Sequence, residues 1–77
     1  MKVEILGVGC AKCKRQVRNV ERAVRELGVD AEVVKVEDIG EIVDRGVMMT
    51  PAVAVDGEVR SSGRIADVEE VKRMLGT

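Results

Sequence analysis

Cys10 and Cys13 are the residues whose type and spacing in this sequence could do chemistry. With Cys10 at the start of a helix and Cys13 one turn inside it, their Cα atoms would lie roughly 5 to 5.5 Å apart, which a disulfide accepts. Thiolates are also the ligands that soft ions such as Cu(I) and Zn prefer. The pair is therefore compatible with a reversible redox couple, a soft-metal clamp or a structural cross-link.

The cross-link is the weakest of these interpretations, because joining residues three positions apart removes little entropy from the unfolded chain. A closed structural zinc site needs four ligands, whereas the chain has two cysteines and no histidine. A two-thiolate Cu(I) site needs nothing more, and "GVGCAKC" is similar to the CxxC loop of heavy-metal-associated domains. A Cu(I) or Zn carrier that uses Cys10 and Cys13 is the alternative to the redox couple.

In the redox interpretation the two sulfurs have different roles. The positive end of a helix favours the thiolate form of Cys10, and the thiolate is the species that attacks disulfides. Cys13, partly covered by the helix, would then resolve the mixed disulfide. Lys12 and its basic neighbours add positive charge, but exposed cations are screened. We expect the Cys10–Cys13 disulfide to be the redox group, with no bound cofactor.

The first half of the chain predicts a strand, a helix and a second strand. Residues 2–8 have the pattern of a strand, and a helix follows the cysteines and ends at Gly28, where a left-handed residue is favoured. Residues 29–38 form the next apolar run, and this succession predicts a parallel, right-handed crossover. The predicted apolar face of the helix consists of Val17, Val20, Val24 and Leu27.

The second half predicts a short helix over 39–44, a hairpin and a last helix. Residues 52–55 form a strand, Asp56-Gly57 favours a two-residue turn, and an antiparallel partner strand follows near Val59. Asp67 can cap the last helix with Glu70 three residues on, as in a capping box. The predicted order is βαβαββα, with helices on both faces of a mixed sheet. Heavy-metal-associated domains have the order βαββαβ instead.

Length and composition bound the function. A chain of 77 residues is predicted to be one domain, 1–77, and the lack of aromatic residues excludes base stacking. A net charge of −1 gives no global attraction to nucleic acid or to anionic membranes. No apolar stretch could span a bilayer and no signal peptide is recognisable, so we expect a cytoplasmic monomer. The 35% of charged residues is typical of a thermophilic source.

The single proline stands in "MMTPAVAV", immediately before the predicted third strand. A proline is tolerated at the first position of a strand, so Pro51 is compatible with a plain strand start. A functional interpretation is a cis Thr50–Pro51 bond that faces the cysteines. CxxC after the first strand, Thr-Pro before the third and the βαβαββα order together resemble the thioredoxin fold, specifically the small glutaredoxin-like, redox-active-disulfide proteins of archaea and bacteria.

This resemblance implies a four-stranded mixed sheet in the order 2-1-3-4 and a thiol–disulfide oxidoreductase activity on protein disulfides. It implies that Cys10 is the nucleophile, that Cys13 is the resolving thiol, and that a cis Thr50–Pro51 peptide packs beside them. An electron-donating reductase is the second implied partner. Because aromatic anchors are missing, the surface near Cys10 should be aliphatic or backbone-mediated. The predicted substrate-binding residues are Ala11, Lys12, Met49, Thr50 and Pro51.

Overall fold

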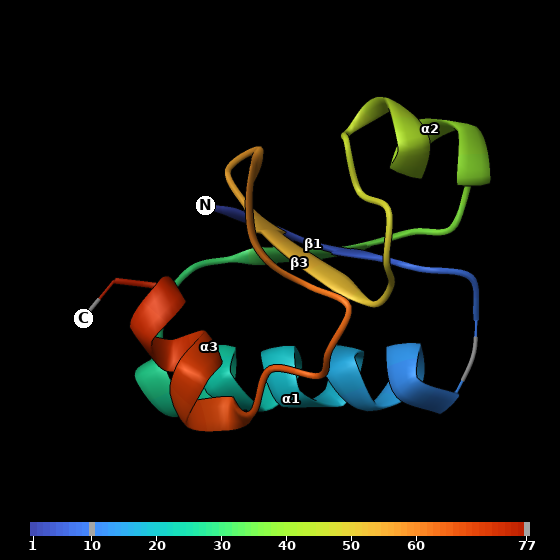
Figure 1. Cartoon of the computed structure of the whole chain (residues 1–77). Helices are drawn as coiled ribbons and strands as arrows, with labels where there is room; N and C mark the ends of the chain where they lie inside the picture. Colours follow the sequence, from blue (N-terminus) through green and yellow to red (C-terminus); the bar gives the residue numbers. More distant parts are fainter. Residues whose placement is uncertain (10, 77) are drawn as a thin grey trace.

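The computed structural model describes residues 1–9 and 11–76, and its elements follow the predicted βαβαββα order (Figure 1). The strands are β1 (Lys2–Leu6), β2 (Glu32–Val36), β3 (Ala52–Val55) and β4 (Glu58–Ser62). The helices are α1 (Ala11–Leu27), α2 (Ile39–Asp44) and α3 (Val68–Met74). The strands predicted over 2–8 and 29–38 are too long, since β1 ends at Leu6 and β2 spans only five residues.

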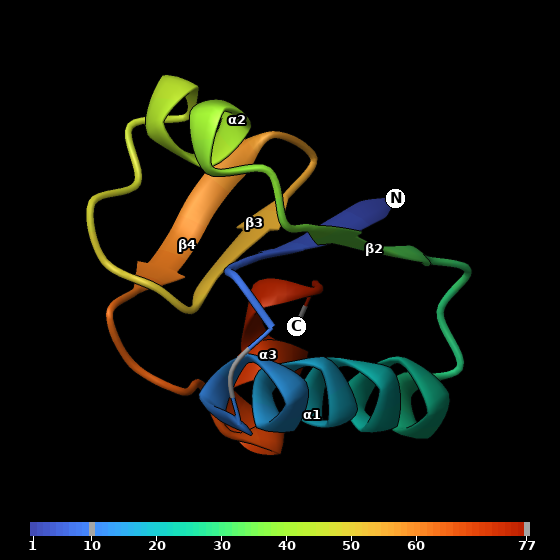
Figure 2. The ribbon, with the colours of Figure 1, turned by 90° about the vertical axis from the view of Figure 1, so that its right-hand side faces the viewer.

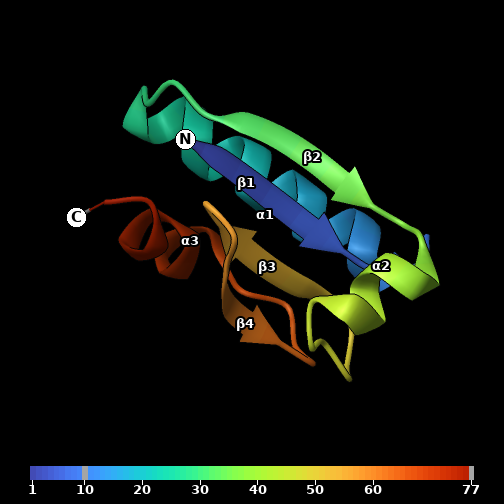
Figure 3. The ribbon, with the colours of Figure 1, turned by 90° about the horizontal axis from the view of Figure 1, so that it is seen from above.

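The four strands form one mixed sheet in the order β2-β1-β3-β4 (Figure 3). β1 pairs in parallel with β2, and α1 makes the crossover connection between them. β1 also pairs antiparallel with β3, where Ile5 lies opposite Val53. β3 and β4 form the antiparallel hairpin. Asp56 and Gly57, with φ of 50° and 87°, make its turn, as the Asp-Gly pair predicts. The predicted sheet order is confirmed.

Helices cover both faces of this sheet, as predicted (Figures 1 and 2). α1 and α3 lie together on one face and α2 lies on the other. Successive side chains of a strand point to opposite faces, so Val3 and Ile5 join the core beneath α1 and α3, whereas Leu6 joins a smaller cluster with Ile42 of α2. None of the helices in the described part of the chain is long and apolar enough to cross a membrane.

Local signals account for the ends of the helices. The backbone N–H of Gly28, which has a φ of 65°, donates to the Val24 carbonyl at 3.0 Å and closes α1. Asp67 caps α3, because its carboxylate accepts from the Glu70 backbone N–H at 2.8 Å. The capping box is only half made. The carboxylate of Glu70 pairs with Arg64 instead of returning to the cap, because an arginine is within reach.

The buried side of α1 differs from the predicted valine face. Val20 is fully buried, but the three other predicted residues are only half-buried. The buried residues of α1 are Cys13, Gln16, Val20 and Ala23. Hydrophobic periodicity does not predict that Gln16 is buried, because its side chain is polar. Its amide donates to the Ala66 carbonyl at 3.0 Å and accepts from the Ala66 N–H at 2.7 Å, which satisfies the buried polar atoms.

Candidate functional site

Three segments of the chain meet at the sulfur of Cys13. Cys13 lies in the first turn of α1 and is 5% exposed. Gly7 follows β1 and continues the sheet, since its N–H donates to the Val36 carbonyl at 2.9 Å. A Cβ on Gly7 would overlap the Cys13 Sγ and would lie 3.6 Å from the Cβ of Thr50. The end of β1, the start of α1 and the segment before β3 therefore converge here.

The predicted Thr50–Pro51 pair approaches this junction with its two residues facing different environments. The peptide bond between them is cis. Thr50 is exposed, whereas Pro51 is fully buried, and its carbonyl accepts from the Gly63 N–H at 3.0 Å. The pair is thus tied to the segment after β4. The side chain of Pro51 packs inside the protein and does not contribute to an aliphatic surface.

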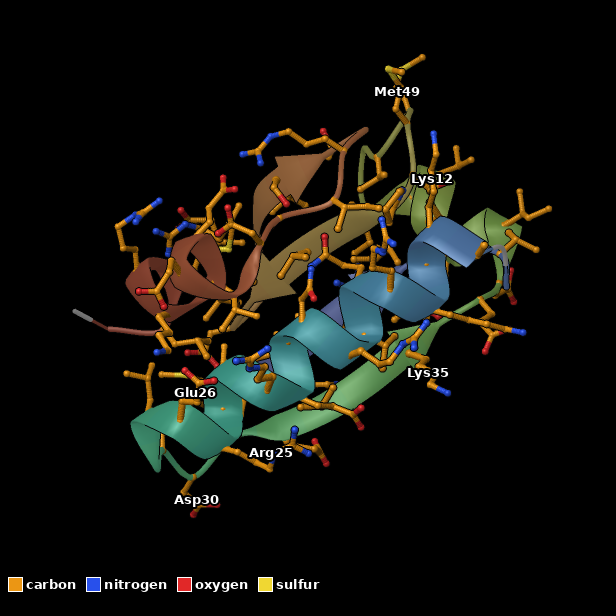
Figure 4. All side chains as sticks on the ribbon, turned by 90° about the horizontal axis from the view of Figure 1, so that it is seen from below. Lys12, Arg25, Glu26, Asp30, Lys35 and Met49 are labelled. Atoms are coloured by element: carbon orange, nitrogen blue, oxygen red, sulfur yellow. The ribbon has the colours of Figure 1, made fainter. Side chains whose placement is uncertain are left out.

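The rim of the junction is apolar and accessible. Met49 is 65% exposed and Met48 is 94% exposed. Met49 packs on Gly63, because a Cβ added to Gly63 would come within 3.1 Å of the Met49 Cβ. Ala11 and Lys12 are also exposed, and Figure 4 places Lys12 and Met49 at the same end of the molecule. Four of the five predicted substrate-binding residues are therefore accessible at this end. They are Ala11, Lys12, Met49 and Thr50.

Cys10, the predicted nucleophile, lies outside the described residues, so its role stays a prediction. α1 begins at the next residue, Ala11, and Cys13 follows two residues later. Within residues 1–9 and 11–76, no group of three or more His, Cys, Asp or Glu side chains could hold a metal ion.

A hollow of about 400 Å³ borders Cys13 on the β2 side of α1. Ile5, Gly7 and Val17 share its lining with the cysteine. Charged residues of both signs complete the wall, namely Lys14, Arg18, Glu21, Lys35 and Glu37. Cys13 thus borders a mixed-charge hollow as well as the junction with Gly7 and Thr50.

An unpredicted ion pair supports the segment that leads to Thr50. Glu4 in β1 is 3% exposed, and its carboxylate accepts from both terminal nitrogens of Arg45, at 2.9 and 2.6 Å. These hydrogen bonds hold the pKa of Glu4 below its ordinary value, although burial opposes them. Arg45 caps the C-terminal end of α2. The pair therefore fixes the end of α2 to the sheet, five residues before Thr50.

Sequence reasoning missed Gly7, Gln16 and Glu4 as residues that shape the site. Gly7 has no side chain that could indicate a role, although its lack of a Cβ makes room for the Cys13 sulfur. Glu4 offers one signal in the sequence. It alternates with Val3 and Ile5, so a strand that is buried on both faces must bury Glu4 as well. A buried carboxylate needs a cation, which predicts an arginine or lysine partner.

Comparisons with known proteins agree with the fold. The family model for the thioredoxin domain matches residues 1–76. A thioredoxin of Methanothermobacter thermautotrophicus is 44% identical over 75 residues, which cover 97% of each chain. A thioredoxin of Methanocaldococcus jannaschii is 48% identical over 73 residues, which cover 95% of this chain and 84% of that protein. The chain therefore belongs to the thioredoxin domain family and has a thioredoxin-like redox function.

Proposed function

We propose that the protein is a thiol–disulfide oxidoreductase that reduces or exchanges the disulfides of protein substrates through Cys10 and Cys13. The observation that carries the proposal is the junction of Cys13 with Gly7 and Thr50. At Gly7 the second cysteine of the CxxC pair and the Thr-Pro segment, 37 positions apart in the chain, approach the same point. The shielded sulfur of Cys13 suits a thiol that reacts with a neighbouring sulfur rather than with dissolved disulfides.

The proposed cycle transfers two electrons to the substrate. The Cys10 thiolate attacks one sulfur of the substrate disulfide, a mixed disulfide forms, and the first substrate sulfur leaves as a thiolate. The Cys13 thiolate then attacks the Cys10 sulfur and releases the second substrate thiolate. Both substrate thiolates take protons from solvent, and a Cys10–Cys13 disulfide remains. An external reductase returns two electrons to this disulfide, and no further cofactor takes part.

The accessible rim supplies the contacts for the substrate. Met49 and Ala11 provide apolar surface, Thr50 borders the junction, and Lys12 adds a cation. Pro51 holds the segment from inside the protein. We propose the cytoplasm as the location, because thiols are kept reduced there. The protein would act as a monomer, with protein disulfides and a reductase as partners and without nucleic acid or membranes.

Reduction of a protein disulfide such as that of insulin tests the proposal. The wild type should reduce it with many turnovers when a reductant is supplied, and Cys10→Ser should be inactive. Cys13→Ser should complete the first step only and should accumulate a covalent mixed disulfide, which non-reducing mass spectrometry detects. Circular dichroism of both variants checks that the serine leaves the fold intact.

Two results would contradict the proposal. A wild type that oxidises reversibly but reduces no protein disulfide would remove the proposed activity. Stoichiometric Cu(I) binding that requires both sulfurs, without any disulfide reduction, would replace it with the metal-carrier function.

A further inference from the structure

The first part of α1 carries a strong charge of one sign. Residues 11–20 contain Lys12, Lys14, Arg15 and Arg18 and no acidic residue, and all four cations are exposed. Within the described part of the chain, none of the four makes an ion pair within 4.0 Å. The remainder of α1 is balanced instead, with Arg22 paired to Glu26 at 2.6 Å. The cationic end is the end that bears Cys13.

The stability of the helix does not explain this arrangement. The N-terminal end of a helix is its positive end and favours acidic rather than basic side chains. Lys12 and Arg15, like Arg15 and Arg18, are three positions apart, a spacing at which like charges repel on a helix surface. Lys14 and Arg18 share a hollow with Glu21 and Glu37, whereas the hollow lined by Lys12 and Arg15 contains no acidic residue. Local helix stability therefore gives no reason for cations at Lys12 and Arg15.

Three of the cations form a stripe that leads away from the cysteines. Lys12, Arg15 and Arg18 line a shallow hollow with Ala11 and Ile65, and no acidic residue belongs to its lining. At 1.5 Å per helical residue, the stripe is about 9 Å long. An extended peptide covers this length with about three residues. In Figure 4, Lys12 lies at the same end of the molecule as Met49, whereas Arg25 lies towards the opposite end of α1.

We propose that Lys12, Arg15 and Arg18 form a docking stripe for acidic segments of protein partners. The segment carries Asp or Glu within about three residues of the disulfide that Cys10 attacks. Complementary charge raises the rate of association and orients the partner, while the Met49 rim contacts apolar residues beside the disulfide. The inference rests on the proposed function and adds the charge of the substrate to it.

Three disulfide-bonded peptides test the stripe. The three peptides share one sequence except at two positions, both within three residues of the cysteine. These two positions are both Asp in the acidic peptide, both Asn in the neutral peptide and both Lys in the basic peptide. At about 0.02 M salt, kcat/KM of the wild type should fall from the acidic to the neutral to the basic peptide, with about tenfold between the extremes. At about 0.5 M salt the three values should converge, because screening removes the attraction.

Arg15→Glu and Arg25→Glu are matched variants, because both arginines are exposed on α1 and both substitutions change the charge equally. Arg15→Glu should lower kcat/KM for the acidic peptide at least threefold and should raise it for the basic peptide. It should leave the neutral peptide unchanged. Arg25→Glu should retain the order of the wild type. A glutamate near a helix N-terminus is favourable, so the thermal midpoint of Arg15→Glu should not fall.

The possible failures are distinguishable. Equal kcat/KM for all three peptides would overturn the stripe and leave the oxidoreductase proposal standing, whereas no reduction of any peptide would overturn both. Equal effects of the two variants would show that only net charge matters. A loss on the neutral peptide in Arg15→Glu would assign the cations to activation of the thiol. Binding of a single-stranded oligonucleotide in preference to the acidic peptide would assign them to phosphate.

Discussion

The two faces of the sheet are covered in different ways. On the face of α1 and α3, Val3, Ile5 and Val53 are at most 2% exposed and pack against two helices. On the other face, α2 has six residues, of which Ile39 and Val43 are each 64% exposed. The first face is closed by a broad apolar core, whereas the second is closed by a short helix that an ion pair holds in place.

The candidate site combines one part from each face. Cys13 belongs to α1, on the broad core, and Thr50 follows α2, on the lightly covered face. Regions with few buried apolar groups open locally at a lower free energy than the global core does. The comparison therefore predicts a firmly placed sulfur beside a more adjustable segment, and substitutions on each face can test this difference.

Matched truncations give the largest expected effect. Ile5 is 2% exposed beneath α1, and Ile42 is 5% exposed beneath α2. Ile5→Ala should lower the free energy of unfolding by about 3 to 5 kcal/mol and Ile42→Ala by about 2 kcal/mol, because the looser site can collapse around the lost methyl groups. Denaturant titration measures both values. Ile42→Ala should also speed hydrogen exchange in α2. Equal losses of stability in the two variants would contradict the distinction between the faces.

The buried amide of Gln16 tests whether the broad face depends on polar contacts as well. Gln16→Ala leaves the Ala66 N–H without its acceptor and opens a small cavity, so stability should fall by about 2 to 3 kcal/mol. Asn19→Ala is the control, since Asn19 also donates to the Ala66 carbonyl, at 3.0 Å, but is only half-buried. It should cost about 1 kcal/mol. A similar loss in both variants would show that burial of Gln16 is unimportant.

The ion pair on the second face should make stability depend on pH. Folding lowers the pKa of Glu4 below its ordinary value of 4.5. The ion pair therefore stabilises the fold fully above pH 4.5, and this stabilisation is lost as the pH falls through the lower pKa that Glu4 has in the folded state. Glu4→Gln should reduce stability by about 1 to 2 kcal/mol at neutral pH, because Arg45 stays partly hydrated. The difference from the wild type should shrink in acid.

Glu41→Gln is the control for this titration. Glu41 also contacts Arg45, at 3.4 Å, but its side chain is 52% exposed. Its substitution should change stability by less than about 0.5 kcal/mol at any pH. If Glu4→Gln were equally mild, the pair would not be what holds α2.

The smallest effect is expected at the surface of α3. Arg64 pairs with Glu70, and the Arg64 side chain is 53% exposed. Arg64→Ala should lower the free energy of unfolding by about 0.5 kcal/mol or less, and added salt should reduce this difference. A loss as large as that of Glu4→Gln would mean that burial does not separate the two pairs.

Most of the fold could be predicted from the sequence because the residues that begin and end its helices and turns act locally. Gly28, Asp56-Gly57 and Asp67 each act on residues within a few positions, and each ends or begins an element as expected. The lengths of β1 and β2 could not be predicted, because a strand ends where its partner ends. The pairing of β1 with β2 runs from Lys2 to Leu6, although the apolar pattern of the sequence continues beyond Leu6.

The site was predicted in its parts but not in its contacts. Residue types and spacing indicated the CxxC pair and the Thr-Pro step. The contact of both with Gly7 depends on how distant segments fold together, which the local pattern does not contain. The burial of Gln16 was missed for a related reason. Its partner Ala66 is 50 positions away, and only that partner makes a buried amide favourable.

Gly7 has a consequence for mutational tolerance. Its Cα lies so close to the Cys13 sulfur that even a methyl group on Gly7 would displace that sulfur. Val8, the next residue, is 54% exposed. A saturation library selected for disulfide reduction should therefore retain only glycine at position 7 and accept most residues at position 8, so that an invariant and a freely variable position stand side by side in the selected sequences.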